Sequence, residues 1–394
     1  MNRKRIALVT GTRADFGAVG AIYKALASIE QFDPVLYITG MHLLERFGTT
    51  VDEIVNGGIR TYKTVQMYDD TSDLKSENLM CYVDSISKAV RGFGDAFSKD
   101  KPDLVILTGD RIEMLAACVA AAVLKLPIAH VHGGDSAWSG QIDEQIRHAI
   151  TKFSHLHFAA TDLSKKRILQ MGEEEWRVFN TGSPNLDSMR EENLLEKNEL
   201  IRNLGLENKL NVSDPMVLCV FHPPILNHVY SGKYAREMFE CLKRLDLHVI
   251  SIYPNNDPGS ELIIQELVRL ENEPKFHVYR NLSRKVYLSL MKHAMFMIGN
   301  SSSGIIESAF FHLPVVNIGD RNLDREASDN VINVKQDIES IWKGILLATS
   351  KDFIEKCSRV ENKYGDGTAG KKIAAILQKF QDFGSLLKKD FVIR

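Results

Sequence analysis

Residues 6–20 read IALVTGTRADFGAVG, an apolar run followed by a glycine turn and a helical pattern. The run Ile6–Thr10 has the composition of a β-strand that is buried on both faces, and the pattern after it predicts a helix. Nucleotide-binding folds place a phosphate loop at this position. However, the stretch matches neither G-x-G-x-x-G nor G-x-x-x-x-G-K-[ST], because Arg13 stands where a glycine is required. The stretch predicts a parallel α/β fold with an arginine at its first phosphate-binding position.

Outward from this stretch, short apolar runs alternate with helical patterns, which is the signature of βαβ units. A polar, charged segment over 188–215 interrupts the alternation, which resumes at Met216. A chain of 394 residues also exceeds the size of one ordinary core. We predict two Rossmann-like, doubly wound α/β domains over 1–182 and 183–366, with an amphipathic helix over 367–394 that packs back on the first domain. Ligands of such sheets lie at the carboxyl ends of the strands, so the residues that follow strands are the candidates for a site.

Composition excludes several classes of partner. The net charge of −2 argues against a nucleic-acid-binding protein, which needs a basic face. No stretch approaches the ~20 consecutive apolar residues that span a bilayer, and the apolar run at the start of the chain is too short for a signal peptide. The five cysteines form no C-x-x-C pair, which is typical of reduced thiols. We therefore expect a cytoplasmic protein without a nucleic-acid or membrane partner.

Charged and imidazole side chains follow the first two predicted strands and the strand over 103–109. A guanidinium at a helix start, as at Arg13, can bind a phosphate through two nitrogens, and the alternative is a surface ion pair. His42 follows a glycine turn in TGMH. Asp110 and Arg111 follow a strand in LTGDR. Asp110 could cap the next helix and pair with Arg111, or it could be a catalytic base with Arg111 as the neighbouring anion-binding group.

The segment AHVHGGDSAWSGQIDEQIRHAI, over 129–150, holds further candidates. His130 and His132 are two residues apart, so on a strand both would point to one face. Asp135 is close in the sequence and could complete a metal site with them. No third-ligand spacing such as HExxH completes the set, and we predict no metal. Asp143 and Arg147 lie at i and i+4 of a predicted helix. They could form a structural ion pair, or Asp143 could be a carboxylate base oriented for the reaction.

In the second half, His222 follows a strand in VFHPP, where the prolines turn the chain out of the sheet. The stretch IGNSSSGIIE combines serines, a glycine and the start of an apolar helix, which is an arrangement that binds anions. Glu307 could accept a hydrogen bond from a ribose, and Arg321 follows the next strand. Six residues of this half are therefore candidates: His222, Ser301, Ser302, Ser303, Glu307 and Arg321.

Taken together and in this order, the motifs resemble those of the hydrolysing UDP-N-acetylglucosamine 2-epimerases of sialic-acid biosynthesis. The resemblance covers residues 6–335 and is carried by GTRADFG, TGMH, GDR, HVHGG, IDEQIRHAITK, FHP, GNSSSGIIE and NIGDR. It implies two Rossmann-like domains in a GT-B-type arrangement, with the active site in the interdomain cleft. It also implies conversion of UDP-GlcNAc and water to N-acetylmannosamine and UDP, by elimination to 2-acetamidoglucal and then hydration.

The resemblance further implies a role for each candidate. Proton transfer would fall to Asp110 and Asp143, with His132 and His222 as further catalytic groups, and the sugar would contact His42, Asp110 and Arg147. The residues implied to bind UDP are Arg13, Arg111, His222, Ser301, Ser302, Ser303, Glu307 and Arg321. One position departs from the pattern, since animal and non-hydrolysing relatives have a glutamate where this chain has His132. A mechanism with three carboxylates therefore cannot be transferred unchanged.

Several alternatives stay open on these residues. The same reaction on a UDP- or GDP-linked 2,4-diacetamido-2,4,6-trideoxyglucose is the nearest. A non-hydrolysing UDP-GlcNAc 2-epimerase typically carries GTRPE and HRRE, where this chain has GTRAD and FHPP. A GT-B glycosyltransferase and a nucleotide-sugar sensor without activity are the alternatives from other classes. We expect no cofactor, because the chain lacks a loop for NAD, and we expect a homo-oligomer, a dimer or a tetramer.

Overall fold

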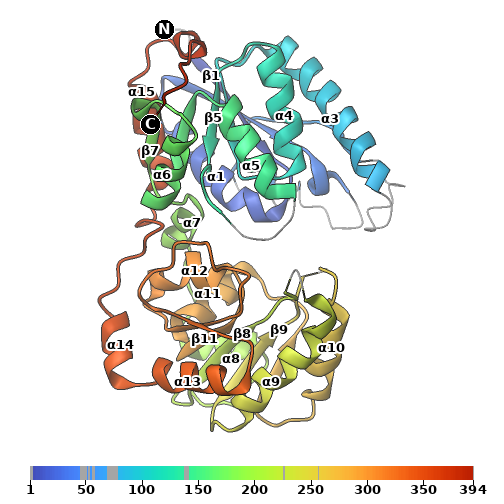
Figure 1. Cartoon of the computed structure of the whole chain (residues 1–394), viewed down its shortest axis with the longest axis vertical. Helices are drawn as coiled ribbons and strands as arrows, with labels where there is room; N and C mark the ends of the chain where they lie inside the picture. Colours follow the sequence, from blue (N-terminus) through green and yellow to red (C-terminus); the bar gives the residue numbers. More distant parts are fainter. Residues whose placement is uncertain are drawn as a thin grey trace. The chain divides into compact units, whose positions relative to one another are not determined.

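The computed structural model describes residues 3–44, 51, 54–55, 58–68, 79–136, 142–224, 227–255 and 257–393. The side chains of Arg13, Ala14, Leu79 and Glu191 are outside this description. The chain forms two compact units, drawn in Figure 1, and each is described by itself. Unit 1 contains the described residues of Met1–Ser136, Gln141–Arg190 and Tyr364–Arg394, and unit 2 contains those of Glu191–Lys363.

Unit 1 is built on a parallel sheet with the strand order β3-β2-β1-β4-β5-β6-β7. Its strands are β1 (Lys4–Thr10), β2 (Phe32–Ile38), β3 (Tyr62–Thr64), β4 (Leu104–Thr108), β5 (Ile128–Val131), β6 (Leu156–Ala159) and β7 (Val178–Asn180). Its helices are α1 (Arg13–Ala27), α3 (Leu79–Asp100), α4 (Ile112–Val123), α5 (Ile142–Phe153), α6 (Asp162–Gln170), α7 (Asn185–Glu191) and α15 (Ala369–Gln378). The strand order reverses between β1 and β4, and such a switch point is where open α/β sheets bind ligands.

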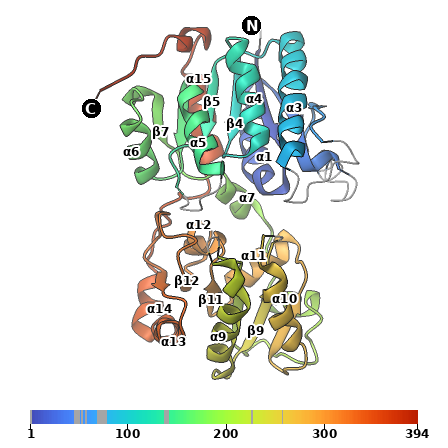
Figure 2. The ribbon, with the colours of Figure 1, turned by 45° about the vertical axis from the view of Figure 1, so that its right-hand side comes forward.

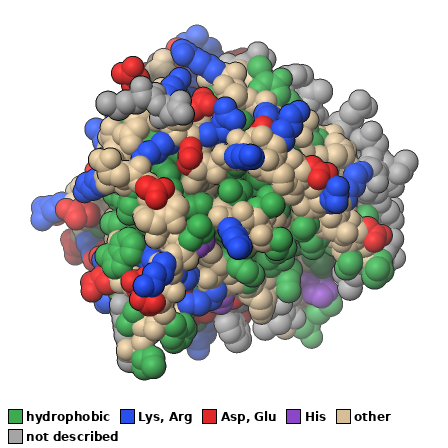
Figure 3. All heavy atoms as spheres, turned by 90° about the horizontal axis from the view of Figure 1, so that it is seen from above, with side chains coloured by type: hydrophobic (Ala, Val, Ile, Leu, Met, Phe, Trp, Pro, Cys, Tyr) green, Lys and Arg blue, Asp and Glu red, His purple; other side chains and the backbone are tan. Residues whose placement is uncertain are grey.

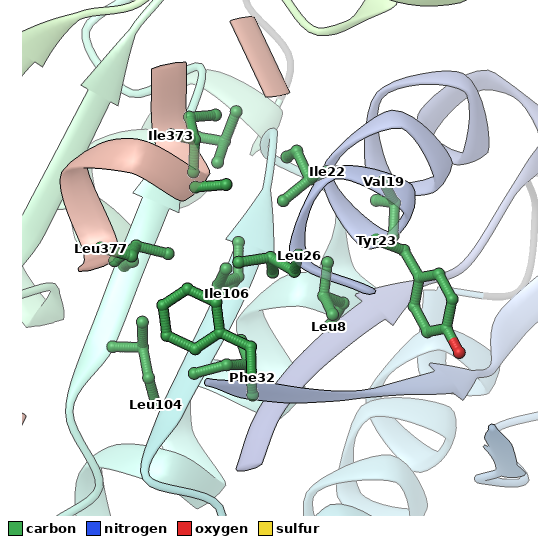
Figure 4. Close-up of a cluster of buried hydrophobic side chains, with 14 of the residues drawn as sticks. Leu8, Val19, Ile22, Tyr23, Leu26, Phe32, Leu104, Ile106, Ile373 and Leu377 are labelled. Carbon is green, nitrogen blue, oxygen red and sulfur yellow. The ribbon is translucent and has the colours of Figure 1, made fainter. Parts of the chain in front are cut away.

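Each face of this sheet has its own hydrophobic core. On one face, side chains of α1 and α15 pack on β1, β2 and β4, as Figure 4 shows for Ile22, Leu26, Ile106, Ile373 and Leu377. On the other face, α3 and α4 lie side by side (Figure 2) and pack on the same strands. Because both faces are covered, β4, β5 and β6 are buried along their whole length, which explains their wholly apolar or nearly apolar sequences.

Unit 2 repeats the architecture with a parallel sheet of order β10-β9-β8-β11-β12-β13. Its strands are β8 (Met216–Val220), β9 (His248–Ile252), β10 (Phe276–Tyr279), β11 (Phe296–Gly299), β12 (Val315–Ile318) and β13 (Val331–Val334). Its helices are α8 (Lys197–Asn203), α9 (Ser231–Lys243), α10 (Ser260–Arg269), α11 (Arg284–His293), α12 (Ser303–Ile306), α13 (Ile338–Ala348) and α14 (Lys351–Cys357). The switch point lies between β8 and β11, so the loops after these two strands meet there.

The prediction of two parallel, doubly wound α/β sheets is confirmed. The unit boundaries differ from those we placed after residues 182 and 366, since the structure divides the chain after Arg190 and Lys363. The reason is that α7 belongs with the C-terminal helix. The Asp187 carboxylate accepts hydrogen bonds from the backbone N–H groups of Ala369 (2.9 Å) and Gly370 (2.7 Å), at the start of α15.

The C-terminal helix is shorter than predicted. The sequence suggested a helix over 367–394, but α15 ends at Gln378, and a 3-10 turn over Gly384–Leu387 follows. Phe383 and Leu386 of this irregular segment are nevertheless buried in the core of unit 1. The apolar residues beyond Gln378 are thus explained by burial of a turn and not by continuation of the helix.

Surface and cysteine properties complete the description. On the face shown in Figure 3, basic and acidic side chains are interspersed among the described residues and form no continuous basic area. The part of the chain that the structure describes contains no helix with both the length and the apolar character that a membrane span requires. The five cysteines carry free thiols.

Candidate functional site

The loop after β1 is organised by a buried carboxylate. Asp15, in the first turn of α1, accepts hydrogen bonds from the backbone N–H groups of Gly11 (3.2 Å) and Thr12 (3.1 Å) and from the hydroxyl of Thr10. Burial raises the pKa of Asp15 to about 6, although these hydrogen bonds act in the opposite direction. Asp15 therefore shapes the turn that starts α1 at Arg13, whose side chain lies outside the described residues.

His42 belongs to the same region. It lies in a 3-10 turn after β2 and is buried. Its Nε2 is 3.1 Å from the Thr10 hydroxyl oxygen. Because this hydroxyl donates to Asp15, its oxygen accepts from Nε2–H of His42, which places the ring proton on Nε2.

The loop after β4 and the helix α5 bring four predicted residues together. Arg147 of α5 is buried and donates to the Asp110 carboxylate, to Glu144 and to the carbonyl oxygen of Asp135 (2.9 Å). Of the two alternatives for Asp143 and Arg147, the i,i+4 ion pair is not formed, since the ion pairs of Arg147 with described residues are those with Asp110 and Glu144.

Asp143 keeps its carboxylate near this cluster without pairing to Arg147. Burial raises its pKa, and the negative charge of Asp110 acts in the same direction, while Arg111 and Arg147 oppose the shift. The cluster thus contains two carboxylates with different environments. Asp110 is held by a buried guanidinium, and Asp143 is poised to exchange a proton nearer to neutral pH than an ordinary aspartate.

The structure changes the interpretation of the two histidines of HVHGG. His130 is fully buried, with Nε2 2.8 Å from the Gly109 carbonyl oxygen and Nδ1 3.0 Å from the Thr151 hydroxyl. The strand β5 ends at Val131, and His132 adopts a left-handed backbone conformation with φ of 65°. The two rings therefore do not share one strand face, as the spacing suggested. His132 instead lies beside Ser183, whose hydroxyl is 3.0 Å from its Nε2.

In unit 2, the loops after β8 and β11 are joined through Asn300. The Asn300 side chain accepts from the backbone N–H of His222 (2.7 Å) and donates to the carbonyl oxygen of the same residue (2.9 Å). The backbone N–H of Asn255 donates to Nδ1 of His222 (3.2 Å). This places the proton of the neutral ring on Nε2, which is then free of the Asn255 contact and able to donate.

His222 should therefore stay neutral over the physiological range. Burial lowers its pKa to about 4, and the positive charge of Arg321 acts in the same direction. We expect long-range ¹H–¹⁵N spectra to show the Nε2–H tautomer without titration between about pH 5 and 8. The signal is assigned by its loss in His222→Gln. A ring that becomes an imidazolium at about pH 6 would contradict this prediction.

A cavity of about 410 Å³ opens beside this loop. Its lining residues are Val220, His222, Ile252, Tyr253, Pro254, Asn255, Arg280, Asn281, Leu282, Tyr287, Ser301 and Ser303. The hydroxyl groups of Tyr287 and Ser303 are hydrogen-bonded, and Ser301 Oγ lies 2.9 Å from Ser303 Oγ. A larger hollow of about 820 Å³ lies at α14, but charged side chains that pair with one another, such as Arg359 and Glu355, line it.

Two expectations for unit 2 need correction or refinement. The helix that begins in GNSSSG is only the four-residue α12 and is followed by a 3-10 turn. Its dipole is therefore small, and the candidate anion-binding groups of this loop are its hydroxyl and backbone N–H donors. Glu307 is the residue after α12, and its carboxylate pairs with Arg284 at 3.3 Å. Burial raises the pKa of Glu307 despite this partner.

Arg321 donates to Asp257 (3.1 Å) and to the Pro223 carbonyl oxygen (3.1 Å).

Sequence reasoning missed several residues of these regions. Glu113, at the start of α4, is fully buried and pairs with Arg111. A lone acidic residue in the apolar run IEMLAACVAAAVL was a signal that could have identified it. Arg280 and Tyr287, which line the cavity of unit 2, carried no comparable signal. Within the described residues, no group of three or more His, Cys, Asp or Glu side chains is close enough to hold a metal ion.

Comparison with known proteins identifies the family. The family model described as UDP-N-acetylglucosamine 2-epimerase matches residues 24–378. The chain belongs to the UDP-N-acetylglucosamine 2-epimerase family. Among its relatives within this family is the UDP-N,N'-diacetylbacillosamine 2-epimerase (hydrolyzing) of Legionella pneumophila, 34% identical over 98% of both chains. The GDP/UDP-N,N'-diacetylbacillosamine 2-epimerase (hydrolyzing) of Campylobacter jejuni is also 34% identical, over 100% of both.

Solved structures of UDP-GlcNAc 2-epimerases share the fold of this family member. The Neisseria meningitidis enzyme, crystallised with UDP-GlcNAc, aligns with a TM-score of 0.80 over 95% of this chain and 100% of its own. The sequence identity in this alignment is 19%, so the comparison supports the fold and not the substrate. The predicted family is thereby confirmed, and the roles of individual residues are taken up as proposals.

Proposed function

We propose that the chain is a hydrolysing nucleotide-sugar 2-epimerase, in which unit 1 carries out the sugar chemistry and unit 2 binds the nucleotide. The observation that carries the proposal is the cluster of Asp110, Asp143, Arg111 and Arg147 beside the switch point of unit 1. It combines two carboxylates in different environments with two guanidinium groups. That combination suits proton transfer next to a leaving phosphate.

The reaction sets the chemical demands. The C2 hydrogen of the sugar is not acidic in the ground state, because no carbonyl is adjacent to it. As the C1–O bond to UDP breaks, positive charge develops at C1, a base removes the C2 proton, and a C1=C2 double bond forms. Water then adds its hydroxyl to C1, and C2 gains a proton on the opposite face. Asp110 and Asp143 act on the two faces, one as the base and the other as the acid, and the raised pKa of Asp143 suits a group that exchanges a proton in either role.

The departing diphosphate must be stabilised as it accumulates charge. His222 donates through Nε2, and Ser301, Ser302 and Ser303 supply hydroxyl or backbone donors from one loop. Arg13, Arg111 and Arg321 add positive charge. The cavity of unit 2 receives the nucleoside, with Glu307 at the ribose.

The sugar-binding role is assigned to three residues: His42, Asp110 and Arg147. His132 takes the place of a glutamate in related enzymes and acts as a proton carrier, since an imidazole can accept and donate near neutral pH. The Ser183 hydroxyl, 3.0 Å from its Nε2, orients the ring.

Two substrates are candidates. UDP-GlcNAc, giving N-acetylmannosamine and UDP, is the one that the sequence motifs suggest. The second is UDP- or GDP-linked 2,4-diacetamido-2,4,6-trideoxyglucose, which is N,N'-diacetylbacillosamine. Two relatives named as hydrolyzing 2-epimerases of nucleotide-linked N,N'-diacetylbacillosamine are 34% identical to this chain. A Neisseria meningitidis relative named as a UDP-N-acetylglucosamine 2-epimerase is 29% identical. This difference favours the diacetamido sugar.

An assay of nucleotide release separates these possibilities. We expect release of the nucleotide with formation of the free 2-epimer in ²H₂O, one deuterium at C2, and a higher kcat/KM for the diacetamido substrate than for UDP-GlcNAc. Accumulation of UDP-ManNAc would place the chain among non-hydrolysing epimerases, and a requirement for an acceptor would indicate a glycosyltransferase. Nucleotide binding without turnover of any of these sugars would indicate a sensor. Independence from added metal and cofactor, a homo-oligomeric state and a cytoplasmic location remain predictions.

A further inference from the structure

Glu113 lies outside every role assigned above, and we propose that it is a positioning residue that fixes the orientation of the Arg111 guanidinium for the reaction. The inference rests on the proposed function, in which Arg111 lies beside the leaving diphosphate. Glu113 does not itself contact the substrate in this proposal. It acts through the guanidinium that it binds.

The first support is the geometry of the pair. Arg111 precedes α4 and Glu113 lies in its first turn, so their side chains meet at the carboxyl end of β4. Arg111 Nε donates to Glu113 Oε2 (3.1 Å) and Nη2 donates to Oε1 (3.3 Å). This two-point contact fixes the plane of the guanidinium, as a single hydrogen bond could not. Among the described residues Nη1 has no hydrogen-bond partner, which leaves it for a ligand.

Burial is unequal across this pair. The Arg111 side chain is 37% exposed, whereas that of Glu113 is 0% exposed. The buried carboxylate is thus the fixed half, and the guanidinium is the half that reaches solvent and a ligand. Although burial of the guanidinium works against it, the negative charge of Glu113 raises the pKa of Arg111. Arg111 therefore keeps its positive charge at any pH at which the enzyme works.

Glu113 also contacts the two neighbouring strand ends. A Cβ atom on Gly11 would lie 2.8 Å from Glu113 Cγ, and a Cβ on Gly40 would lie 3.0 Å from the same atom and 2.7 Å from the Gly11 carbonyl oxygen. The hydroxyl of the buried Tyr68 is 3.4 Å from Glu113 Oε1. At Gly11 the Glu113 side chain occupies the space of a methyl group, whereas at Gly40 the Gly11 carbonyl oxygen, the Glu113 side chain and a backbone φ of 63° together require glycine. One carboxylate thereby joins the loops after β1, β2 and β4, from which Arg13, His42 and Arg111 arise.

A buried carboxylate in an apolar helix face costs stability unless it serves a partner. An apolar residue at position 113 would avoid this cost but would leave the Arg111 guanidinium without its two-point contact. The need to orient the Arg111 guanidinium accounts for a carboxylate at position 113.

The test combines kinetics with a double-mutant cycle. Glu113→Gln keeps the shape of the side chain and removes its charge, and we expect kcat/KM to fall by roughly 10–100-fold, as for other groups that orient a functional side chain. On the background of Arg111→Gln, the same change should have little further effect, because Glu113 acts through Arg111. Additive effects of the two substitutions, or an unchanged kcat/KM in active enzyme, would overturn the inference.

A control and an independent readout complete the test. Glu173→Gln also removes a fully buried carboxylate of unit 1, but its partners His157 and Lys152 place it near the amino ends of β6 and β7, so kcat/KM should not change in the folded protein. The ¹⁵N–¹H signal of Arg111 Nε, assigned by its absence in Arg111→Gln, should exchange slowly with solvent and should become fast-exchanging in Glu113→Gln. An unaltered signal would overturn the inference even if no substrate is turned over. Failure of the wild-type enzyme to release nucleotide would instead refute the proposed function.

Discussion

Replacing Asp143 with asparagine is expected to lower kcat by roughly 10²–10⁴-fold, the contribution of a positioned general acid or base. Asparagine has nearly the shape of aspartate but can neither take a proton from C2 nor return one to it. Asp143 is the cleaner of the two carboxylates to test. Asp110→Asn would also leave the buried guanidinium of Arg147 without one of its two carboxylate partners and would disturb the structure.

The measurement is nucleotide release in single turnovers, together with UDP affinity by calorimetry. UDP affinity should change little, because the proposed nucleotide contacts of unit 2 are untouched. The matched control is Asp95→Asn, which removes an exposed carboxylate of α3 that pairs with Arg91. Turnover that survives in Asp143→Asn would show that Asp143 transfers no proton in the reaction.

The largest expected loss of stability follows from Glu173→Gln. This fully buried carboxylate accepts from Lys152 Nζ (2.6 Å) and pairs with Lys389 Nζ (3.0 Å), and its Oε2 lies 3.0 Å from His157 Nε2. Removing one partner of a buried charge network typically costs about 3–5 kcal/mol. Because Lys389 belongs to the C-terminal segment, the loss should fall on the attachment of that segment to unit 1.

Amide hydrogen exchange measures this effect locally, which matters because a chain of two units need not unfold in a single step. Protection should fall in β6, β7 and the segment around Lys389. Glu175→Gln, which changes an exposed neighbour, is the control and should leave protection unchanged. Equal protection in wild type and Glu173→Gln would contradict the prediction.

The same network predicts loss of stability in acid. Burial favours the neutral form of Glu173, but its hydrogen bonds from His157 and Lys152 outweigh burial and lower its pKa from 4.5 to about 2. Because the folded pKa is the lower one, this stabilisation is complete above about pH 4.5 and is lost as the pH falls toward about 2. Burial also lowers the pKa of His157, so its contribution is likewise lost as the pH falls below its ordinary value of 6.5.

Much of the fold could be predicted from the sequence. Alternation of apolar runs with helical patterns identified two parallel sheets, because a strand covered on both faces must be apolar along its length. The same logic pointed to residues that follow strands, and Asp110, Arg111, His222 and Ser301 all lie at the switch points. Strand β13 gives a weaker signal of this kind, since its sequence VINV is short and only partly buried.

The sequence by itself determined which side chains stand at the strand ends, since that depends on local periodicity and turn residues. Only the tertiary structure decided how they pair. Arg147 could have paired with Asp143 on its own helix, but it pairs with Asp110 from the loop after β4, and Arg111 is bound by the buried Glu113. The physical reason is that the choice of ionic partner depends on strand order and burial. Both arise from contacts between distant segments, and neither is written in the spacing of residues along one helix.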